Sequence, residues 1–392
     1  MHLAFALSDH GLGHAARMVG LVEWLLSDLS PLSFPDLQLS FLCSSPLRFL
    51  RSVPSLRNAR FFDTPTDFGF LNLPDGTAID PVLSLHALES YISHWRSFLP
   101  SFRDQISSLS VDVLLSDISP FPLLAASDLG IPSAGFSNFT WVDQYHGLSS
   151  LPDIPPLPEV DLSPLVDAYG SADLCFSLPP TMALEGFSRS SFFGLLSRTT
   201  SLSKPSLRRS LHLPDSSTFL VYLGLGAAVQ WPSSLVSIFR SLPSQLLPVQ
   251  FILPALVASQ LPSNPNIHPI PSSTGLAHHW LAASDLAITK PGYSTIAEAL
   301  WHNVPLWLLP LQTPESVFMR SFLTHHDLAR PVTVEDLSDL SLFLSLPSNP
   351  PSPAIVPPSW RSLNWSAFGS FLESSGCEVL WSDPSPPSSN GP

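Results

Sequence analysis

The chain has 392 residues, longer than a single hydrophobic core usually extends, so two domains are expected. Hydrophobic residues make up 44% and charged residues 12%, which is typical of globular proteins and excludes a disordered chain. The formal net charge of -14 argues against nucleic acid or anionic lipid as the main partner, although one electropositive cleft could still bind a phosphate-bearing small molecule.

The three cysteines are Cys43, Cys175 and Cys377, and their wide, odd-numbered spacing indicates neither a disulfide framework nor a zinc site. No stretch reaches the roughly 18 apolar residues that a membrane-spanning helix needs. We therefore expect a cytoplasmic protein with no metal. Peripheral membrane contact and the oligomeric state stay open.

The first half of the chain alternates between apolar runs and helical patterns. Strands are expected at residues 3–8, 37–43, 111–116 and 131–136, and helices at 15–28 and 122–129. Continuous apolar runs are typical of parallel strands that are buried on both faces. This order of elements predicts an α/β fold with a doubly wound parallel sheet.

The pattern is lost across residues 178–214, which we interpret as the connection between two domains, and a second cycle then begins. Strands are expected at 218–223, 249–253, 286–289 and 305–309, and helices at 233–241, 294–302, 315–327 and 334–344. The expected domains are therefore residues 1–180 and 200–345. Residues 345–358 form a linker, 360–373 an amphipathic segment and 383–392 a disordered tail.

The first candidate site residues lie between the first strand and the first helix, where ligands bind in such sheets. His10, Gly11, Gly13 and His14 fall in this loop. Glycines let the backbone approach a ligand, and the following helix N-terminus favours an anion. His14 could act as a general base towards a hydroxyl group. A histidine that caps or packs the turn is the open alternative.

Asp117 closes the strand at 111–116, at the same edge of the same expected sheet as His14. A carboxylate bonded to one imidazole nitrogen would fix the tautomer and stabilise the imidazolium that forms when the base accepts a proton. The alternative is an N-cap for a helix that begins at Pro120 or Pro122. Asp117 stands three or more residues too early for that, so we favour the catalytic role.

A second glycine turn joins a strand to a helix at residues 289–300. The backbone N–H groups and hydroxyls near Ser294 and Thr295, after Gly292, could hold a diphosphate at the helix N-terminus. Stabilisation of a departing diphosphate in this way would remove the need for a metal. Thr295 and Glu298 also fit a capping box, and this structural explanation of the glutamate stays open.

Three further features carry weaker signals. Gly224 and Gly226 form a matching loop in the second half, suited to a phosphate. The histidine pairs at 278–279 and 325–326 do not indicate a metal, because adjacent side chains point in different directions. Phe136, Phe139 and Trp141 could stack on a sugar, but we expect core packing for at least two of them.

Several of these segments resemble the glycosyltransferase-like N-terminal region of plant L-arabinokinases. They are HGLGHAAR (10–17), VLLSDISP (113–120), SNFTW (137–141) and KPGYSTIAEAL (290–300). The last segment also resembles the donor-site signature of the family that makes peptidoglycan lipid intermediates and plant galactolipids. The resemblance covers most of residues 1 to 330, in order.

The resemblance implies the GT-B fold, in which two Rossmann-like domains face each other across a cleft, and the segment 360–375 returns to the first domain. It implies an inverting glycosyltransferase with a nucleotide-sugar donor, expected to be a UDP-sugar, and no further cofactor. His14 would be the base and Asp117 its partner, while Glu298 would bind ribose. Gln312 and Glu315 would face the donor sugar, and the acceptor side would hold His10, Arg17, Asn138 and Trp141.

The sequence therefore predicts transfer of a sugar from a nucleotide to an acceptor hydroxyl that His14 deprotonates. The alternatives are a nucleotide-sugar epimerase or hydrolase of the same fold and a binding module without activity. In each case the partners are small molecules.

Overall fold

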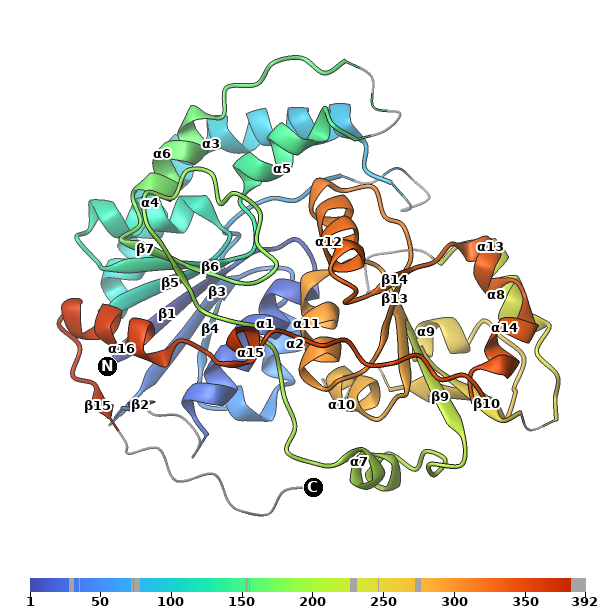
Figure 1. The fold of residues 1–392 in the computed structure, drawn as a ribbon. Coiled ribbons are helices and arrows are strands. Elements are labelled where there is room, and N and C mark those ends of the chain that lie inside the picture. The colour runs from blue at the N-terminus through green and yellow to red at the C-terminus, as the bar shows by residue number, and fades with distance from the viewer. Residues whose placement is uncertain are drawn as a thin grey trace.

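Two parallel sheets, each covered by helices, divide the protein into the two halves seen on the left and right of Figure 1. The computed structural model describes residues 1–381 except 28–31, 35, 72, 74–77, 152–153, 155, 226–230, 246 and 272–275. The predicted disordered tail and Gly226 lie outside the described residues.

The first sheet has seven described strands, and every pairing within it is parallel. All six residues of the interior strand β1 (His2–Leu7) are buried, as the apolar run predicts for a strand covered on both faces. In spatial order the strands are β4 (Arg60–Asp63), β3 (Gln38–Cys43), β1 (His2–Leu7), β5 (Val113–Asp117), β6 (Ser133–Ser137), β7 (Leu174–Ser177) and β8 (Ser190–Phe192).

The second sheet has six described strands and is also parallel throughout. In spatial order they are β11 (Ile267–Ile270), β10 (Val249–Pro254), β9 (Phe219–Gly224), β12 (Leu286–Thr289), β13 (Leu306–Leu308) and β14 (Arg330–Pro331). The predicted fold class, with two doubly wound parallel sheets, is confirmed.

Helices cover both sheets. Those of the first half are α1 (Leu12–Leu25), α2 (Leu47–Arg51), α3 (Pro81–Leu109), α4 (Pro120–Asp128), α5 (Trp141–Leu148) and α6 (Ser163–Gly170). Those that follow are α7 (Lys204–Ser210), α8 (Ser233–Arg240), α9 (Ala255–Ala258), α10 (Ala277–Ala282), α11 (Tyr293–Trp301), α12 (Pro314–His325), α13 (Val334–Leu337) and α14 (Leu340–Ser345).

The C-terminal segment crosses from the second half back to the first, as the red ribbon of Figure 1 shows. It contains α15 (Pro358–Arg361) and α16 (Trp365–Ser374), and a short pairing of β15 (Leu380–Trp381) with β2 (Leu32–Ser33) follows. Phe368 of α16 is fully buried, and its ring contacts Phe136, Phe176 and Phe193 beside the first sheet. This segment is therefore part of the core of the first half.

The strand order reverses direction once in each sheet, and this reversal positions the site. In the first sheet the chain runs outward from β1 to β3 on one side and to β5 on the other. In the second sheet the same reversal lies between β9 and β12. Loops that leave two such neighbouring strands diverge, so a ligand can bind between them.

Several sequence expectations need correction. Helix α1 begins at Leu12, three residues earlier than predicted, and the helix predicted at 334–344 is broken into α13 and α14. The connection predicted at 178–214 is partly ordered structure, because β8 extends the first sheet and α7 precedes the second. These pieces are three and seven residues long, too short to show a clear hydrophobic period.

Within the described part of the chain, no helix combines the length and the apolar character needed to cross a membrane.

Candidate functional site

The loops at the two strand-order reversals contact each other where the halves meet. The hydroxyl of Ser294 on α11 donates a hydrogen bond of 2.6 Å to the carbonyl oxygen of Gly13 on α1. A further bond of 3.1 Å joins the Tyr293 hydroxyl to the backbone N–H of Leu196. The opening glycine loop and the start of α11, which the sequence expects to share one ligand, are therefore neighbours.

His14 and Asp117 form a hydrogen-bonded pair. Nδ1 of His14 lies 2.7 Å from Oδ1 of Asp117, and the two side chains are 11% and 0% exposed. Asp117 is the last residue of β5, and Ser119, not Asp117, occupies the N-cap position of α4. The capping explanation of Asp117 is therefore wrong.

The protonation of this pair follows from its geometry. An ionised carboxylate can only accept, so the short contact assigns the imidazole hydrogen to Nδ1. Nε2 of His14 then carries the free lone pair, and it makes no hydrogen bond to any described residue. A lone pair held in this way is what a general base needs.

Arg17 holds Asp117 from the other side. Its Nε donates to Oδ2 over 2.5 Å and its Nη2 donates to Oδ1 over 2.6 Å, so the pair is bidentate. Burial alone would raise the pKa of Asp117, but the charges and hydrogen bonds of Arg17 and His14 outweigh it and hold that pKa below its ordinary value. Asp117 is thus an anion inside the protein.

Arg17 and Asn138, expected on the acceptor side, lie behind the pair and not at a surface. They are 1% and 0% exposed, and Nη1 of Arg17 donates to Oδ1 of Asn138 over 2.6 Å. Nδ2 of Asn138 in turn donates to Oε1 of Glu315 in the second half over 2.9 Å. Both side chains are therefore buried behind the His14–Asp117 pair.

Glu315 and Gln312 are at the start of α12. The Glu315 N–H donates a hydrogen bond of 3.2 Å to Oε1 of Gln144 in the first half. Gln312 is exposed, and its backbone pairs with Ala78 of the first half. The structure therefore places both residues at the boundary between the halves.

The N-terminus of α11 is uncapped. Gly292 is the N-cap and supplies no side chain, and the N–H groups of Tyr293, Ser294 and Thr295 donate to no described residue. Free N–H groups and the helix dipole make such a terminus a binding site for an anion. The predicted capping box of Thr295 and Glu298 is wrong, because the helix begins two residues before Thr295.

Lys290 lies beside this helix terminus, and the sequence argument assigned it no role. A Cβ built on Gly292 would lie 3.5 Å from Cε of Lys290, so the lysine stem runs alongside the N-cap. Burial lowers the pKa of Lys290, and the charge of Glu315 opposes this shift. Lys290 is half-buried, and among the described residues its ammonium has no hydrogen bond and no ion pair.

The carboxylate of Glu298 bonds to Arg198, a partner that the sequence does not predict. Its Oε1 accepts from Nε of Arg198 over 2.9 Å and from Nη2 over 2.7 Å, and the carboxylate is buried. Burial raises the pKa of Glu298, and the charge of Arg198 opposes the shift. Gly224, the described glycine of the matching loop, is buried, and its carbonyl accepts from the Thr289 hydroxyl over 2.6 Å.

His10 and Trp141 pack together below the opening loop. Their rings meet edge to face, and Trp141 is only 1% exposed because Phe68 and Phe70 also cover it. Burial, with help from His14 and Lys290, lowers the pKa of His10 to about 3, so the imidazole is neutral. Phe136, Phe139 and Trp141 are all core residues, and no face of Trp141 is open to a sugar.

Asp67 is a buried carboxyl group close to the site, and the sequence does not predict it. It is 6% exposed and accepts hydrogen bonds from the Asp9 N–H over 2.8 Å and from Nε1 of Trp141 over 3.1 Å. Burial raises its pKa to about 7, against the opposing effects of these bonds and of His14. No local motif marks this residue, which lies beyond the end of β4.

The histidine pairs do not assemble a metal centre in the part of the chain that the structure describes. His278 is buried, and burial lowers its pKa to about 2. His325 and His326 are exposed at the end of α12.

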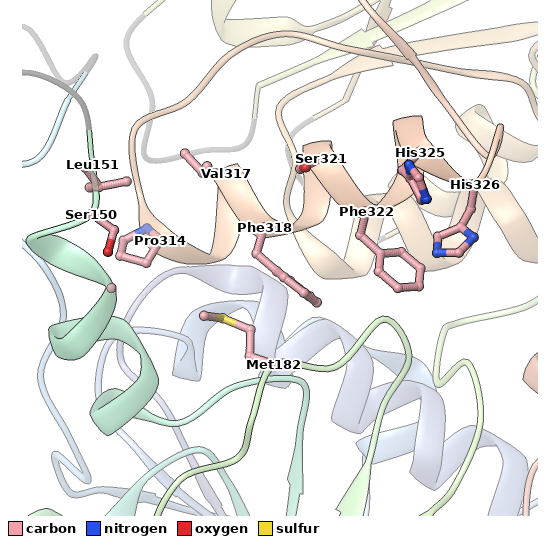
Figure 2. A pocket seen from close by; sticks show the side chains of 11 residues that line it. Ser150, Leu151, Met182, Pro314, Val317, Phe318, Ser321, Phe322, His325 and His326 are labelled. Carbon is pink, nitrogen blue, oxygen red and sulfur yellow. The ribbon is translucent and has the colours of Figure 1, made fainter.

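A cavity of about 450 Å³ lies between the halves and is lined by residues of α5, α12 and the segments that follow α5 and β7 (Figure 2). Figure 2 shows the ring of Phe318 on α12 above Met182 of the first half, and the ring of Phe322 further along the helix near His326. A Cβ on Gly147 would approach Pro314 to 2.7 Å, so the two helices touch along one edge of the cavity. None of the residues that line the cavity belongs to the His14–Asp117 pair.

No protein-family model matches this chain. Over 321 residues it is 24% identical to the L-arabinokinase of Arabidopsis thaliana, an alignment that covers 78% of this chain and 28% of that protein. The chain therefore spans less than a third of the length of this relative.

Solved structures resemble the protein along most of its length. UGT2 of Phytolacca americana, solved with UDP-2fluoro-glucose and pterostilbene, is 15% identical with a TM-score of 0.54, covering 88% of this chain and 90% of that one. A putative UDP-N-acetylglucosamine 2-epimerase from Listeria monocytogenes is 16% identical with a TM-score of 0.53, covering 89% and 88%. These similarities show the fold, and the protein has the GT-B architecture that the sequence predicts.

Proposed function

We propose that the protein is an inverting glycosyltransferase that moves a sugar from a nucleotide-sugar donor, a UDP-sugar, to a hydroxyl group of a small-molecule acceptor. The observation that carries the proposal is the placement of the His14–Asp117 pair next to an uncapped helix terminus. Nε2 of His14 has no partner among the described residues, and Gly13, the residue before it, contacts Ser294 at the start of α11. A base and an anion site thus lie at adjacent loops.

In the proposed reaction the acceptor hydroxyl gives its proton to Nε2 of His14 as its oxygen attacks the anomeric carbon. The bond between that carbon and the diphosphate breaks, and attack from the opposite face inverts the anomeric configuration. The imidazole becomes cationic during this step, and the carboxylate of Asp117, 2.7 Å from Nδ1, stabilises the charge.

The departing diphosphate takes up negative charge, which the first turn of α11 and Lys290 are placed to stabilise. The N–H groups of Ser294 and Thr295 have no described acceptor, and the Lys290 side chain runs alongside Gly292 with no ion pair to any described residue. We propose that these groups, with Gly292 and the loop that begins at Gly224, make a metal unnecessary. Activity should then persist in excess EDTA.

The remaining donor contacts are part of the same proposal. Glu298 would bind ribose through the carboxylate oxygen that Arg198 does not occupy, and Gln312 and Glu315 would face the sugar. Glu315 accepts from Asn138 through Oε1, so it would contact the sugar through Oε2.

The test is turnover of a panel of UDP-sugars with a panel of hydroxyl acceptors, followed by UDP release and product mass. The expected result is a product whose formation falls by about 10²–10⁴ in the His14→Ala variant, the usual cost of losing a general base. Equal turnover by the variant would reject the assignment of the base. UDP binding without turnover of any sugar would instead support a binding module.

The similarity in fold to an epimerase makes a second reaction worth testing. Incubation with UDP-sugars and no acceptor, followed by analysis of the sugar, separates the two functions. An epimerised nucleotide sugar would support the second function, whereas an unchanged donor that reacts only with an acceptor supports transfer.

A further inference from the structure

Arg17 lies between the His14–Asp117 pair and the second half of the protein. It makes more contacts than the two hydrogen bonds that would hold Asp117 in place. It donates twice to Asp117 and once to Asn138, and its guanidinium lies 5.1 Å from the ring centre of Tyr293 on α11. Its Nη2 is also 3.2 Å from Nδ1 of His14.

This last contact cannot be a second good hydrogen bond. Nδ1 of His14 already donates to Asp117, and Arg17 has only donors, so two hydrogen-bearing nitrogens face each other. A proton added at Nε2 would make the imidazole cationic beside a guanidinium whose own charge is fixed. At the same time the guanidinium already shares the negative charge of Asp117.

We infer that Arg17 is a positioning residue that holds Asp117, and through it His14, in place and opposes the addition of a proton at Nε2, so that this lone pair stays available. The inference rests on the proposed role of His14 as the base. An aspartate alone beside a histidine favours the imidazolium. Arg17 adds a cation to this pair and so opposes the binding of a further proton.

The other charged groups near His14 do not provide this effect. His10, in the same loop, is neutral because burial lowers its pKa, and Asp67, whose pKa burial raises to about 7, is an acid and cannot act as a cation. No hydrogen bond or ion pair among the described residues joins Lys290 to His14, and Glu315 is linked to the pair only through Asn138. Phe139 covers an edge of the imidazole, with ring centres 6.0 Å apart. Arg17 is the cation in direct contact.

The link from Arg17 through Asn138 to Glu315 also connects the base to the second half. Every bond in this chain is between 2.5 and 2.9 Å, and Arg17 is additionally covered by Tyr293. The orientation of Asp117, and through it of His14, is therefore best fixed when the halves are in contact. The orientation of the His14 imidazole therefore depends on the position of the second half.

The experiment is a pH titration of ¹⁵N-labelled histidine side chains in the full chain, with the His14 signals assigned by their loss in His14→Gln. In Arg17→Met the midpoint at which His14 gains a proton should move to higher pH by at least one unit, a tenfold change in the protonation equilibrium. An unchanged or lower midpoint would overturn the inference. Arg103→Met removes a half-exposed arginine paired with Asp128 and should leave the midpoint unchanged.

Arg17→Lys provides the second variant if Arg17→Met does not fold. A lysine keeps the positive charge but cannot form the two-pronged contact, so the midpoint should move by less than half a unit while Asp117 loses its fixed orientation. The signal of the hydrogen on Nδ1 should then broaden or disappear. A sharp Nδ1–H signal identical to that of the unsubstituted protein would contradict the positioning role.

Kinetics give an independent readout once a donor and acceptor are known. Arg17→Met should lose kcat mainly on the acid side of the pH profile, with the KM of the donor little changed, because the acid limb moves to higher pH. A purely structural role would lower kcat by the same factor at every pH. The titration needs no substrate, so absence of transferase activity would leave its outcome readable.

Discussion

The hydroxyl of Ser294 is bonded to the carbonyl of Gly13, and this contact joins the two halves at the point where the proposed donor would lie. The hydroxyl hydrogen is directed at the first half and not at the space above α11. Of the two hydrogen-bond donors of Ser294, only the backbone N–H has no described acceptor and can bind a phosphate in this arrangement.

Ser294→Ala should therefore weaken UDP binding by less than about threefold, because the hydroxyl hydrogen is committed to Gly13 and the N–H remains. The bond itself contributes about 0.5–1.5 kcal/mol to the contact between the halves. Calorimetric titration with UDP measures the effect. A loss greater than about tenfold would mean that the hydroxyl turns to the phosphate when the ligand binds.

Arg198 and Glu298 form a buried pair, and removing only the arginine should destabilise the protein strongly. Arg198→Met leaves a buried carboxylate without its cation, at a cost of about 3–5 kcal/mol. The pKa of Glu298 is already raised by burial and would rise further. A folded-state pKa above the unfolded value means that stability is lost as pH rises, so the deficit should be larger at pH 8 than at pH 5.

Denaturant unfolding of Arg198→Met, Glu298→Leu and the double variant measures this coupling. The double variant should recover most of the lost stability, because no unpaired charge remains inside the protein. If the effects of the two single variants simply add, the pair does not contribute as a pair.

Asp67 should make the protein less stable as pH rises from about 4 to about 7. Its pKa is about 7 when folded, against 3.8 as the ordinary value, so in this window the folded state holds the extra proton. Three pKa units correspond to about 4 kcal/mol at most. Only about two of these units lie between pH 5 and pH 7, so the stability of the unsubstituted protein relative to Asp67→Asn should fall by up to about 2.7 kcal/mol between pH 5 and pH 8.

Asp104→Asn, on the exposed face of α3, is the control for this comparison. Its stability relative to the unsubstituted protein should change little over the same range. Parallel pH dependence in the Asp67 and Asp104 variants would show that the buried carboxyl is not the source.

Phe368→Ala should cost about 3–5 kcal/mol, although the residue lies in the returning C-terminal segment. Its ring is fully buried against three aromatic rings, so truncation leaves a large cavity in the core of the first half. Phe98→Ala is the matched control, because that ring is 57% exposed on α3. Similar unfolding midpoints for the two variants would contradict the packing described for α16.

The sequence predicted the fold because its signals are local and strong. The apolar run that ends at Asp117 and the strand before Lys290 are each buried on both faces, and such runs read as parallel strands. The polar residues that follow them necessarily meet at one edge of a sheet. The sequence therefore predicts that His14 and Asp117 are neighbours, and the hydrogen bond between them confirms it.

The partners of the site residues could not be predicted in the same way. Arg17 bonds to a residue 100 positions away, and so does Arg198. No local pattern encodes such pairs, which depend on how the elements pack. The burial of Trp141 could not be predicted either, because the residues that cover it, Phe68 and Phe70, lie in a loop far away in the sequence.

The error at Glu298 has a local cause. A capping box requires the helix to begin at the capping residue, and the boundaries of helices are the least certain part of a pattern. Since α11 begins at Tyr293, Thr295 falls inside the first turn, and its hydroxyl cannot cap the helix. Glu298 was left free to pair with Arg198.

The central claim is that the start of α11 and Lys290 form an anion site beside His14. Calorimetric titration of UDP into the unsubstituted protein and into Lys290→Met tests it most directly. Lys204→Met is the matched control, because the other lysine of the chain is paired with Asp285 at the base of the second half. We expect stoichiometric binding that weakens at least tenfold in Lys290→Met and is unchanged in Lys204→Met. Equal affinity in all three proteins, or no binding in any, would contradict the account.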